Sequence, residues 1–300
     1  MTDVTTKNWM QALDKRLTLD QISMPGTHDS GTAKAPPGAA RTQNFGIYTQ
    51  LNDGIRFLDI RVDANGSESD PLNIYHGIIS CGISLGNVLD DCLIFLLKNP
   101  SETLVMLMDA ATGSVKNVQE KFDDYIAQEK YQSLFYLESR VPTLQQCQGK
   151  IVLLRRFAGN TGIDLSYGWK VNETFTLTTP EQQIFEIEDQ YKEHNTHKKL
   201  AAVEASINSA ITNPDDGVMH ITYNSIAQGG HTPYQYAWGG GLSKVDPMMN
   251  PGLTEFLQRQ QVGARFGIVV LDFYNNEASN PDNRNAELII ATNPGVVLES

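Results

Sequence analysis

The sequence lacks the features that mark several broad classes of protein. No stretch of its 300 residues approaches the roughly 20 consecutive apolar residues that span a bilayer, and residues 1–17 lack the apolar core of a secretory signal. We therefore expect no transmembrane segment, with any export signal absent from this chain. Cysteine is also scarce: Cys81, Cys92 and Cys147 are an odd number without metal-ligand spacing, which argues against a complete disulfide framework and against a zinc site.

Positive charge is scarce as well, with 23 basic against 35 acidic residues and a net charge of −12. This negative net charge argues against binding to nucleic acid, and against binding to an anionic membrane through bulk electrostatics. The chain is 40% hydrophobic, so it can bury a full core, and its length fits two ordinary domains or one large α/β barrel. No repeat, low-complexity segment or long linker divides it, and we expect a single domain over residues 1–300.

Eight short apolar runs recur along the chain, and most are followed by a polar residue and a segment of helical period. Helical spacing is clearest in residues 85–96, 115–129 and 198–212. Alternating strands and helices of this number predict an α/β fold, a (βα)8 TIM-type barrel. The expected strands are 21–24, 55–62, 72–77, 103–109, 150–156, 185–189, 218–224 and 267–274.

Polar residues lie at the end of every one of these expected strands. In a βα barrel the C-terminal ends of the strands meet at one face, which carries the chemistry. Chance can place one or two such residues in surface loops, but it rarely places them at all eight strand ends. The set therefore indicates an active site. Its members are His28, Asp29, Asp59, Arg61, His76, Asp109, Arg155, Arg156, Asp189, Tyr191, Tyr223, Asn224 and Asp272.

Two histidines stand out within this set. The turn at residues 25–31 leaves an apolar strand and presents His28 beside Asp29, although a turn of this composition also serves to cap a helix. His76 ends another expected strand, and the two histidines face each other only if the barrel brings these strand ends together. Facing imidazoles can act as general base and general acid across one phosphorus atom.

Charged residues on two other strands complete the candidate site. The strand at 55–62 places Asp59 and Arg61 on one face and apolar residues on the other. Inside a barrel, an arginine beside carboxylates is costly as a purely structural pair, so phosphate binding is the better interpretation. Asp272 ends a fully apolar run, and an unpartnered carboxylate buried there would be costly. Because the first and last strands of a closed barrel are neighbours, we expect Asp272 to orient His28.

Taken together, these residues resemble the bacterial phosphatidylinositol-specific phospholipases C. The similarity runs from about residue 20 to about residue 290, and the set of motifs is specific although each motif alone is weak. It implies a distorted barrel that cleaves phosphatidylinositol. The motifs are PGTHDSG, IRFLDIR, YHG, NPSETLVM, GKIVLLRRF, NETFT, EDQY and VLDFYN.

The resemblance implies roles for most of these polar residues. His28, held by Asp272 and Asp29, would take the proton of the inositol 2-hydroxyl as this oxygen attacks the phosphorus, and His76 would protonate the departing diacylglycerol oxygen. The product would be inositol 1,2-cyclic phosphate. Two further groups of residues match the family's pattern. They are Arg61 with Asp59 for the phosphate, and Arg156, Asp189 and Tyr191 for the inositol ring.

One departure from the family's pattern concerns a metal. The metal-independent bacterial enzymes have a lysine where this chain has Asp109, whereas calcium-dependent eukaryotic relatives have a glutamate there. With Asp29 and Asp59, Asp109 would complete a set of hard oxygen ligands, and we expect a Ca²⁺ ion on these three carboxylates. The counter-argument is Arg61, because a guanidinium repels a metal ion; in that alternative Arg61 alone supplies the charge.

The resemblance also implies transient contact with a membrane by a monomeric, secreted enzyme in its mature form. Candidate lipid-facing rims are residues 35–48 and 234–238, although core packing explains their aromatic residues equally well. An enzyme alternative is a glycerophosphodiester phosphodiesterase or a sphingomyelinase D-like barrel. A non-catalytic inositol-binding barrel is the alternative outside enzymes, but it would not need both histidines and Asp272.

Overall fold

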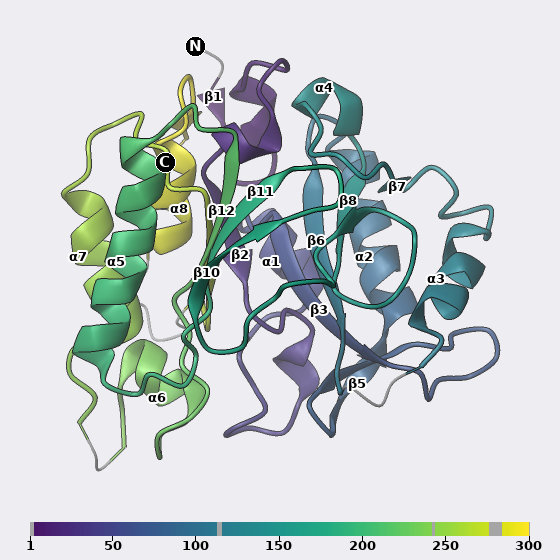
Figure 1. The fold of residues 1–300 in the computed structure, drawn as a ribbon, viewed down its shortest axis with the longest axis horizontal. Helices are drawn as coiled ribbons and strands as arrows, with labels where there is room; N and C mark the ends of the chain where they lie inside the picture. The colour runs from purple at the N-terminus through teal and green to yellow at the C-terminus, as the bar shows by residue number, and fades with distance from the viewer. Residues whose placement is uncertain (1–2, 113–115, 242–243, 276–283, 300) are drawn as a thin grey trace.

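The computed structural model describes residues 3–112, 116–241, 244–275 and 284–299. Its centre is a curved sheet of twelve strands with helices packed around it (Figure 1). Seven neighbouring strands of this sheet run parallel to one another. In spatial order they are β11 (Ile184–Glu188), β12 (Val218–Tyr223), β13 (Ile268–Leu271), β2 (Met24–Thr27), β3 (Phe57–Asp63), β6 (Leu104–Ala110) and β8 (Ile151–Arg155).

The parallel strands follow the order of a βα barrel, but the ring is open at one place. The first and last strands, β2 and β13, are paired, as predicted, with Thr27 opposite Leu271. The pairing that would close the ring, between β8 and β11, is absent from the described strands. The free edge of β8 pairs instead with two short strands, β7 (Phe135–Tyr136) and β9 (Ile163–Asp164), and that of β11 pairs antiparallel with β10 (Thr174–Thr178).

The expected barrel strand at residues 72–77 is a strand, but its place in the barrel is wrong. This segment forms β4 (Asn73–His76), which runs antiparallel both to β3 and to β5 (Ile79–Ser84). Only residues 64–72 connect β3 to β4, fewer than the dozen or so that a crossover between parallel strands needs. The barrel therefore has seven of the eight expected strands, the first of them at Met24–Thr27 and not at 21–24 as expected, and β4 and β5 form a hairpin arm beside it.

Helices follow most of the strands and cover the outside of the sheet, with α2 and α3 on one side and α5, α7 and α8 on the other (Figure 1). The three predicted helices are present; of the expected 115–129 helix, residue 115 lies outside the described residues. No described helix is long and apolar enough to cross a membrane. The helices are α1 (Ile47–Asn52), α2 (Leu85–Lys98), α3 (Val118–Ile126), α4 (Leu144–Cys147), α5 (Thr196–Thr212), α6 (Pro233–Trp238), α7 (Met249–Gln258) and α8 (Asn285–Ala291).

Both faces of the parallel sheet are buried, and side chains alternate between two hydrophobic clusters. On β6, Val105 and Leu107 belong to the cluster inside the barrel, whereas Met106 and Met108 pack against the outer helices. Phe57 of β3 points inward in the same way. The two-residue period of a strand therefore directs Asp59 and Arg61 into the barrel, as the sequence predicted.

Candidate active site

His28 and Asp272 form a buried pair at the ends of two neighbouring strands. They directly follow β2 and β13, whose register places Thr27 opposite Leu271, and His28 Nδ1 lies 2.8 Å from Asp272 Oδ1. Burial lowers the pKa of His28, but the carboxylates of Asp272 and Asp29 outweigh it and raise this pKa to about 9. Since the Asp272 carboxylate accepts a hydrogen bond from Nδ1–H, Nε2 is the nitrogen left for proton transfer, as the sequence predicted for an oriented base.

The backbone beyond each of these residues is in an unusual conformation. Asp29 and Phe273, which follow His28 and Asp272, both have a φ of 44°. An aspartate adopts this left-handed region with modest strain, but a bulky phenylalanine does so rarely, and such a residue costs about 1–3 kcal/mol. The surrounding structure holds the two turns in place: the Gln43 side chain donates hydrogen bonds to the carbonyls of His28 and Leu271, both at 2.9 Å.

His76 faces His28 from the hairpin arm. The ring centroids are 6.5 Å apart and the ring planes are nearly perpendicular, at 79°. His76 Nδ1 donates to the carbonyl of Ala40 at 2.9 Å, which leaves its Nε2 free. The Asp29 Oδ2 atom lies 3.2 Å from His28 Nε2 and 3.5 Å from His76 Nε2, and it is buried without a well-aligned hydrogen bond. The predicted meeting of the two imidazoles is therefore found, although β4 reaches the site from outside the barrel.

Arg61 bridges the two carboxylates on the floor of the site. Its Nε lies 3.0 Å from Asp29 Oδ1 and its Nη2 lies 3.1 Å from Asp59 Oδ2. Burial raises the pKa of Asp59, but the Arg61 guanidinium outweighs it and holds this pKa below its ordinary value. The Arg61 side chain keeps 27% exposure, so its cationic head is accessible from the cavity.

A second group of polar side chains lines the same cavity as the histidines. Arg156 Nη1 is 3.1 Å from Asp109 Oδ2, and the Arg156 guanidinium carbon lies 3.9 Å from the centre of the Trp169 ring. The Trp169 indole N–H donates to Asp189 Oδ2 at 3.1 Å. Tyr191 is half-buried beside them. The structure thus brings together the predicted ring-binding residues and adds Trp169.

One cavity of about 330 Å³ joins the two groups, a size suited to a small polar molecule. Histidines and an arginine at one end can exchange protons with a phosphate ester and stabilise its charge. Paired carboxylates and a guanidinium at the other end can bind hydroxyl groups. The polar and aromatic residues that line it are His28, Arg61, His76, Asp109, Arg156, Trp169, Asp189, Tyr191 and Gln228.

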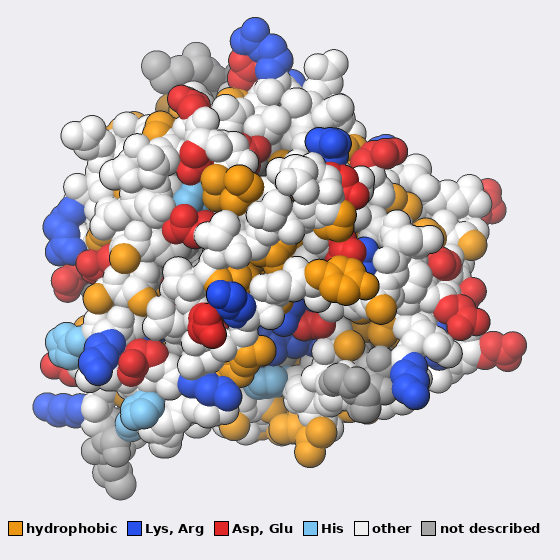
Figure 2. Space-filling view, in the orientation of Figure 1, with side chains coloured by type: hydrophobic (Ala, Val, Ile, Leu, Met, Phe, Trp, Pro, Cys, Tyr) orange, Lys and Arg blue, Asp and Glu red, His pale blue; other side chains and the backbone are white. Residues whose placement is uncertain are grey.

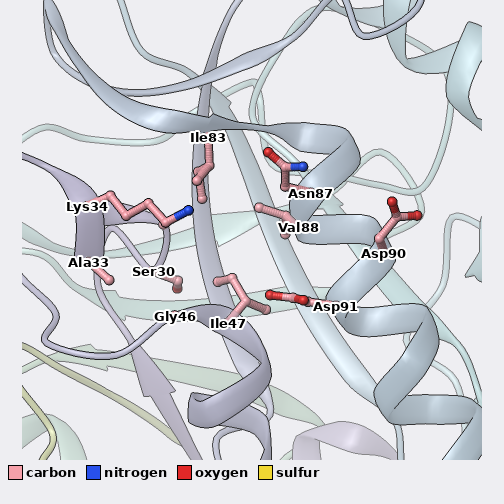
Figure 3. Close-up of a pocket in the computed structure, with 11 residues that line it drawn as sticks. Ser30, Ala33, Lys34, Gly46, Ile47, Ile83, Asn87, Val88, Asp90 and Asp91 are labelled. Atoms are coloured by element: carbon pink, nitrogen blue, oxygen red, sulfur yellow. The ribbon is translucent and has the colours of Figure 1, made fainter.

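Another cavity of about 320 Å³ lies behind the His28 turn, between α1, α2 and residues 30–34 (Figure 3). Its carboxylates are already engaged: Asp90 accepts hydrogen bonds from Lys130 and Tyr131, and Asp91 accepts one from a backbone amide. Neither histidine nor arginine is among the residues that line it. It therefore has no equivalent of the acid–base pair.

The three predicted calcium ligands do not form one shell. Asp109 lies opposite Arg61 in the β3–β6 ladder, but its carboxylate is paired with Arg156. In the part of the chain that the structure describes, the cluster with metal-ligand spacing consists of His28, Asp29 and Asp59, whose ligand atoms lie within 4.8 Å of one another. Calcium prefers six to eight oxygen ligands, and here a guanidinium already bonds both carboxylates. The residues present therefore do not fit the expected site.

The expected lipid-facing rims are partly core: Pro36, Pro37 and Ala39 are exposed beside the site, but several of the larger side chains are buried. Ile47, Tyr236 and Trp238 are buried, in agreement with the alternative that the sequence left open, and Tyr234 is 36% exposed. The most exposed apolar side chain beside the site is Ile78, at 88%, in the turn of the hairpin arm two residues after His76. The adjacent pair of isoleucines after the YHG motif is the sequence signal that could have identified it.

Two residues of the site were not assigned by the sequence interpretation. Trp169 lies between the short strands β9 and β10, where no periodicity indicates a structure. Tyr223 was noticed at a strand end without a role; its ring meets the His28 ring edge-on, with centroids 6.1 Å apart. The contact partners of both residues are distant in sequence, so only the folded chain shows them.

Comparisons with known proteins agree with this fold. The family model described as phosphatidylinositol-specific phospholipase C, X domain, matches residues 35–157. The 1-phosphatidylinositol phosphodiesterase of Staphylococcus aureus strain Newman is 32% identical over 288 residues, which cover 89% of this chain and 88% of that protein.

Two solved structures show the same fold. A Staphylococcus aureus phosphatidylinositol-specific phospholipase C, from work on modulation of its membrane binding, superposes with a TM-score of 0.85 and 29% identity, over 96% of this chain and 98% of that one. The corresponding Listeria monocytogenes enzyme gives a TM-score of 0.76 and 27% identity, over 97% and 99% of the two chains.

Proposed function

Since the chain belongs to the bacterial phosphatidylinositol-specific phospholipase C family, we propose that it cleaves phosphatidylinositol with His28 as general base and His76 as general acid. The observation that carries this proposal is the pair of imidazoles 6.5 Å apart that line one cavity, each with Nδ1 bound to an acceptor and Nε2 within 3.5 Å of the same Asp29 oxygen. A non-catalytic binding protein would not need this arrangement.

In the proposed step, the inositol 2-hydroxyl oxygen forms a bond to phosphorus and the bond from phosphorus to the diacylglycerol oxygen breaks. His28 Nε2 takes the 2-hydroxyl proton, and His76 Nε2 gives its proton to the leaving oxygen. The products are diacylglycerol and inositol 1,2-cyclic phosphate. A water molecule can open the cyclic ester later with the two histidines in exchanged roles.

The charges around the pair support this assignment. With a pKa of about 9 for His28, the pair holds at least one proton near neutral pH. The productive form is the one in which this proton lies on His76 and His28 is free to accept another. Asp272 fixes the His28 tautomer and stabilises the imidazolium that forms when His28 accepts the proton. Arg61 would stabilise the charge that develops on the phosphate oxygens.

We favour Arg61 over a calcium ion as the source of that positive charge. It already lies between Asp29 and Asp59, whereas the third expected ligand, Asp109, is bound to Arg156. Calcium stays the alternative prediction, and a chelator separates the two. If an ion were bound, it would supply Lewis-acid stabilisation beside His28, Asp29 and Asp59.

We further propose that the enzyme is a secreted monomer that touches the bilayer transiently through the rim of its cavity. Ile78 supports a local apolar contact. The net charge of −12 opposes binding through bulk electrostatics, and on the face shown in Figure 2 acidic and basic side chains are interspersed.

The function is tested with three substrates: vesicles of phosphatidylinositol, vesicles of phosphatidylcholine, and soluble glycerophosphoinositol. A water-soluble cyclic inositol phosphate is expected from phosphatidylinositol and no product from phosphatidylcholine. Release of choline, or hydrolysis of glycerophosphoinositol without action on the lipid, would instead identify one of the related phosphodiesterase classes.

A further inference from the structure

The opening in the barrel lies between the two residues expected to bind the inositol ring. Arg156 directly follows β8 and Asp189 directly follows β11. These are the neighbouring strands that share no backbone ladder in the described part of the sheet. Elsewhere in the barrel, ladder hydrogen bonds fix the distance between strand ends, but the separation of Arg156 and Asp189 needs another constraint.

Trp169 supplies contacts to both sides of this opening. It comes from residues 165–173, which run from β9, on the β8 side, to β10, on the β11 side. The face of its ring lies 3.9 Å from the Arg156 guanidinium carbon, and its indole N–H donates to Asp189 Oδ2 at 3.1 Å. The ring is itself held edge-on against Phe175 of β10, with centroids 5.6 Å apart.

Arg156 is also restrained from its other side. Asp109, on β6, lies 3.1 Å from Arg156 Nη1, so the guanidinium is held between a carboxylate and an aromatic face. A guanidinium over an indole ring is attracted by the ring's electron density, and this attraction grows when water is excluded. The chain of contacts from Asp109 through Arg156 and Trp169 to Asp189 thus spans the opening with side chains alone.

We infer that Trp169 is a positioning residue for recognition of the inositol ring: it joins the two unpaired edges of the barrel and sets Arg156 and Asp189 at the spacing that the ring hydroxyls need. This inference rests on the proposed function, because it takes the ring of phosphatidylinositol as the ligand. The His28, Asp272 and His76 side chains are held by β2, β13 and the hairpin arm, which do not depend on the Trp169 contacts.

A positioning role of this kind predicts that changes at Trp169 affect substrate binding and leave the chemical step almost unchanged. Trp169→Phe keeps an aromatic face for Arg156 and removes the donor to Asp189, so the KM for a soluble short-chain phosphatidylinositol is expected to rise about 5- to 10-fold. Trp169→Leu removes both contacts, and a rise of about 20- to 100-fold is expected. In both variants kcat stays within about threefold of the wild type, because the acid–base pair is unchanged.

Tyr167→Leu is the matched control, since Tyr167 belongs to the same segment and its side chain is 75% exposed. This variant is expected to leave both kinetic constants unchanged. A double-mutant cycle of Trp169→Phe with Asp189→Asn adds a second readout: if the indole acts through Asp189, the combined effect on KM is smaller than the product of the single effects.

The experiment measures KM, kcat and the calorimetric affinity for free myo-inositol in all of these variants. Parallel losses of substrate KM and inositol affinity, at near-constant kcat, support the positioning role. An unchanged KM, a loss confined to kcat, or single effects that multiply fully in the cycle overturn it. Should the wild type fail to cleave phosphatidylinositol, the proposed function fails, while the inositol affinities still decide the role of Trp169.

Discussion

His28 Nδ1 and Asp272 Oδ1 lie 2.8 Å apart although the two residues are 244 positions apart in the sequence. The pairing of β2 with β13 creates this contact, because His28 and Asp272 each follow directly after paired residues of these strands. Both side chains are almost completely buried, so their interaction is screened little by water. The pKa of His28 and the orientation of its Nε2 both depend on this carboxylate.

Replacing Asp272 with asparagine is expected to change both the rate and its pH dependence. The carboxylates of Asp272 and Asp29 together raise the pKa of His28 to about 9 against the opposing effect of burial, so a neutral replacement of Asp272 lowers that pKa. In the wild type, kcat/KM is expected to fall as the pH rises through about 9, because His28 then no longer holds the proton that the pair shares. In Asp272→Asn this basic limb moves to lower pH, and kcat drops about 100- to 10,000-fold.

The control for this variant is Asp124→Asn, which removes an exposed carboxylate on α3. It should leave the pH profile unchanged. If the basic limb of Asp272→Asn stays at the wild-type position while its thermal unfolding is normal, Asp272 does not set the His28 pKa.

Arg61→Lys is expected to lower kcat about 100- to 1,000-fold, because a lysine cannot bond Asp29 and Asp59 together while also facing the phosphate. Excess EDTA is expected to change wild-type activity less than twofold. Loss of activity in EDTA with recovery on adding CaCl₂ would instead support the calcium prediction, with His28, Asp29 and Asp59 as the candidate ligands.

Ile78→Ser is expected to weaken action on vesicles while action on soluble short-chain phosphatidylinositol is unchanged. Burying an isoleucine side chain in an apolar environment contributes about 1.5–3 kcal/mol, so vesicle binding should fall roughly tenfold or more. Sedimentation with phosphatidylinositol vesicles measures this directly.

Val262→Ser is the matched control for the membrane prediction. Val262 is 94% exposed, but it precedes β13 and therefore lies at the opposite end of the barrel from the cavity. Equal losses of vesicle binding in the two variants, or a loss in neither, would show that the hairpin arm is not the membrane contact.

The sequence predicts much of this site because its residues are tied to strand ends. Apolar runs mark the strands, and β2 and β13 are neighbours in any βα barrel, so the partnership of His28 with Asp272 follows from chain order alone. The two-residue period of β3 likewise predicts that Asp59 and Arg61 share the inward face. The local sequence pattern and the barrel topology are therefore sufficient to predict where these four residues lie.

The rest depends on contacts that no local pattern encodes. The 72–77 segment has the composition of a barrel strand, and only the short connection before it shows that it must pair antiparallel. Asp109 forms an ion pair with Arg156, which directly follows the adjacent strand β8, and no local pattern around Asp109 predicts this pair. The proposed role of Trp169 depends on the opening of the barrel between β8 and β11. A prediction of a closed barrel does not include this opening.

The central claim, that His28 removes a proton and His76 donates one across a single phosphorus atom, is tested most directly by changing the leaving group. The measurement compares kcat on phosphatidylinositol with kcat on inositol 1-(4-nitrophenyl phosphate), whose phenolate departs without a proton. His76→Ala should lose about 100- to 10,000-fold on the lipid and far less on the nitrophenyl ester, whereas His28→Ala should lose as much on both and His197→Ala on neither. Equal losses of His76→Ala on the two substrates, or sparing of His28→Ala on the nitrophenyl ester, would contradict the account.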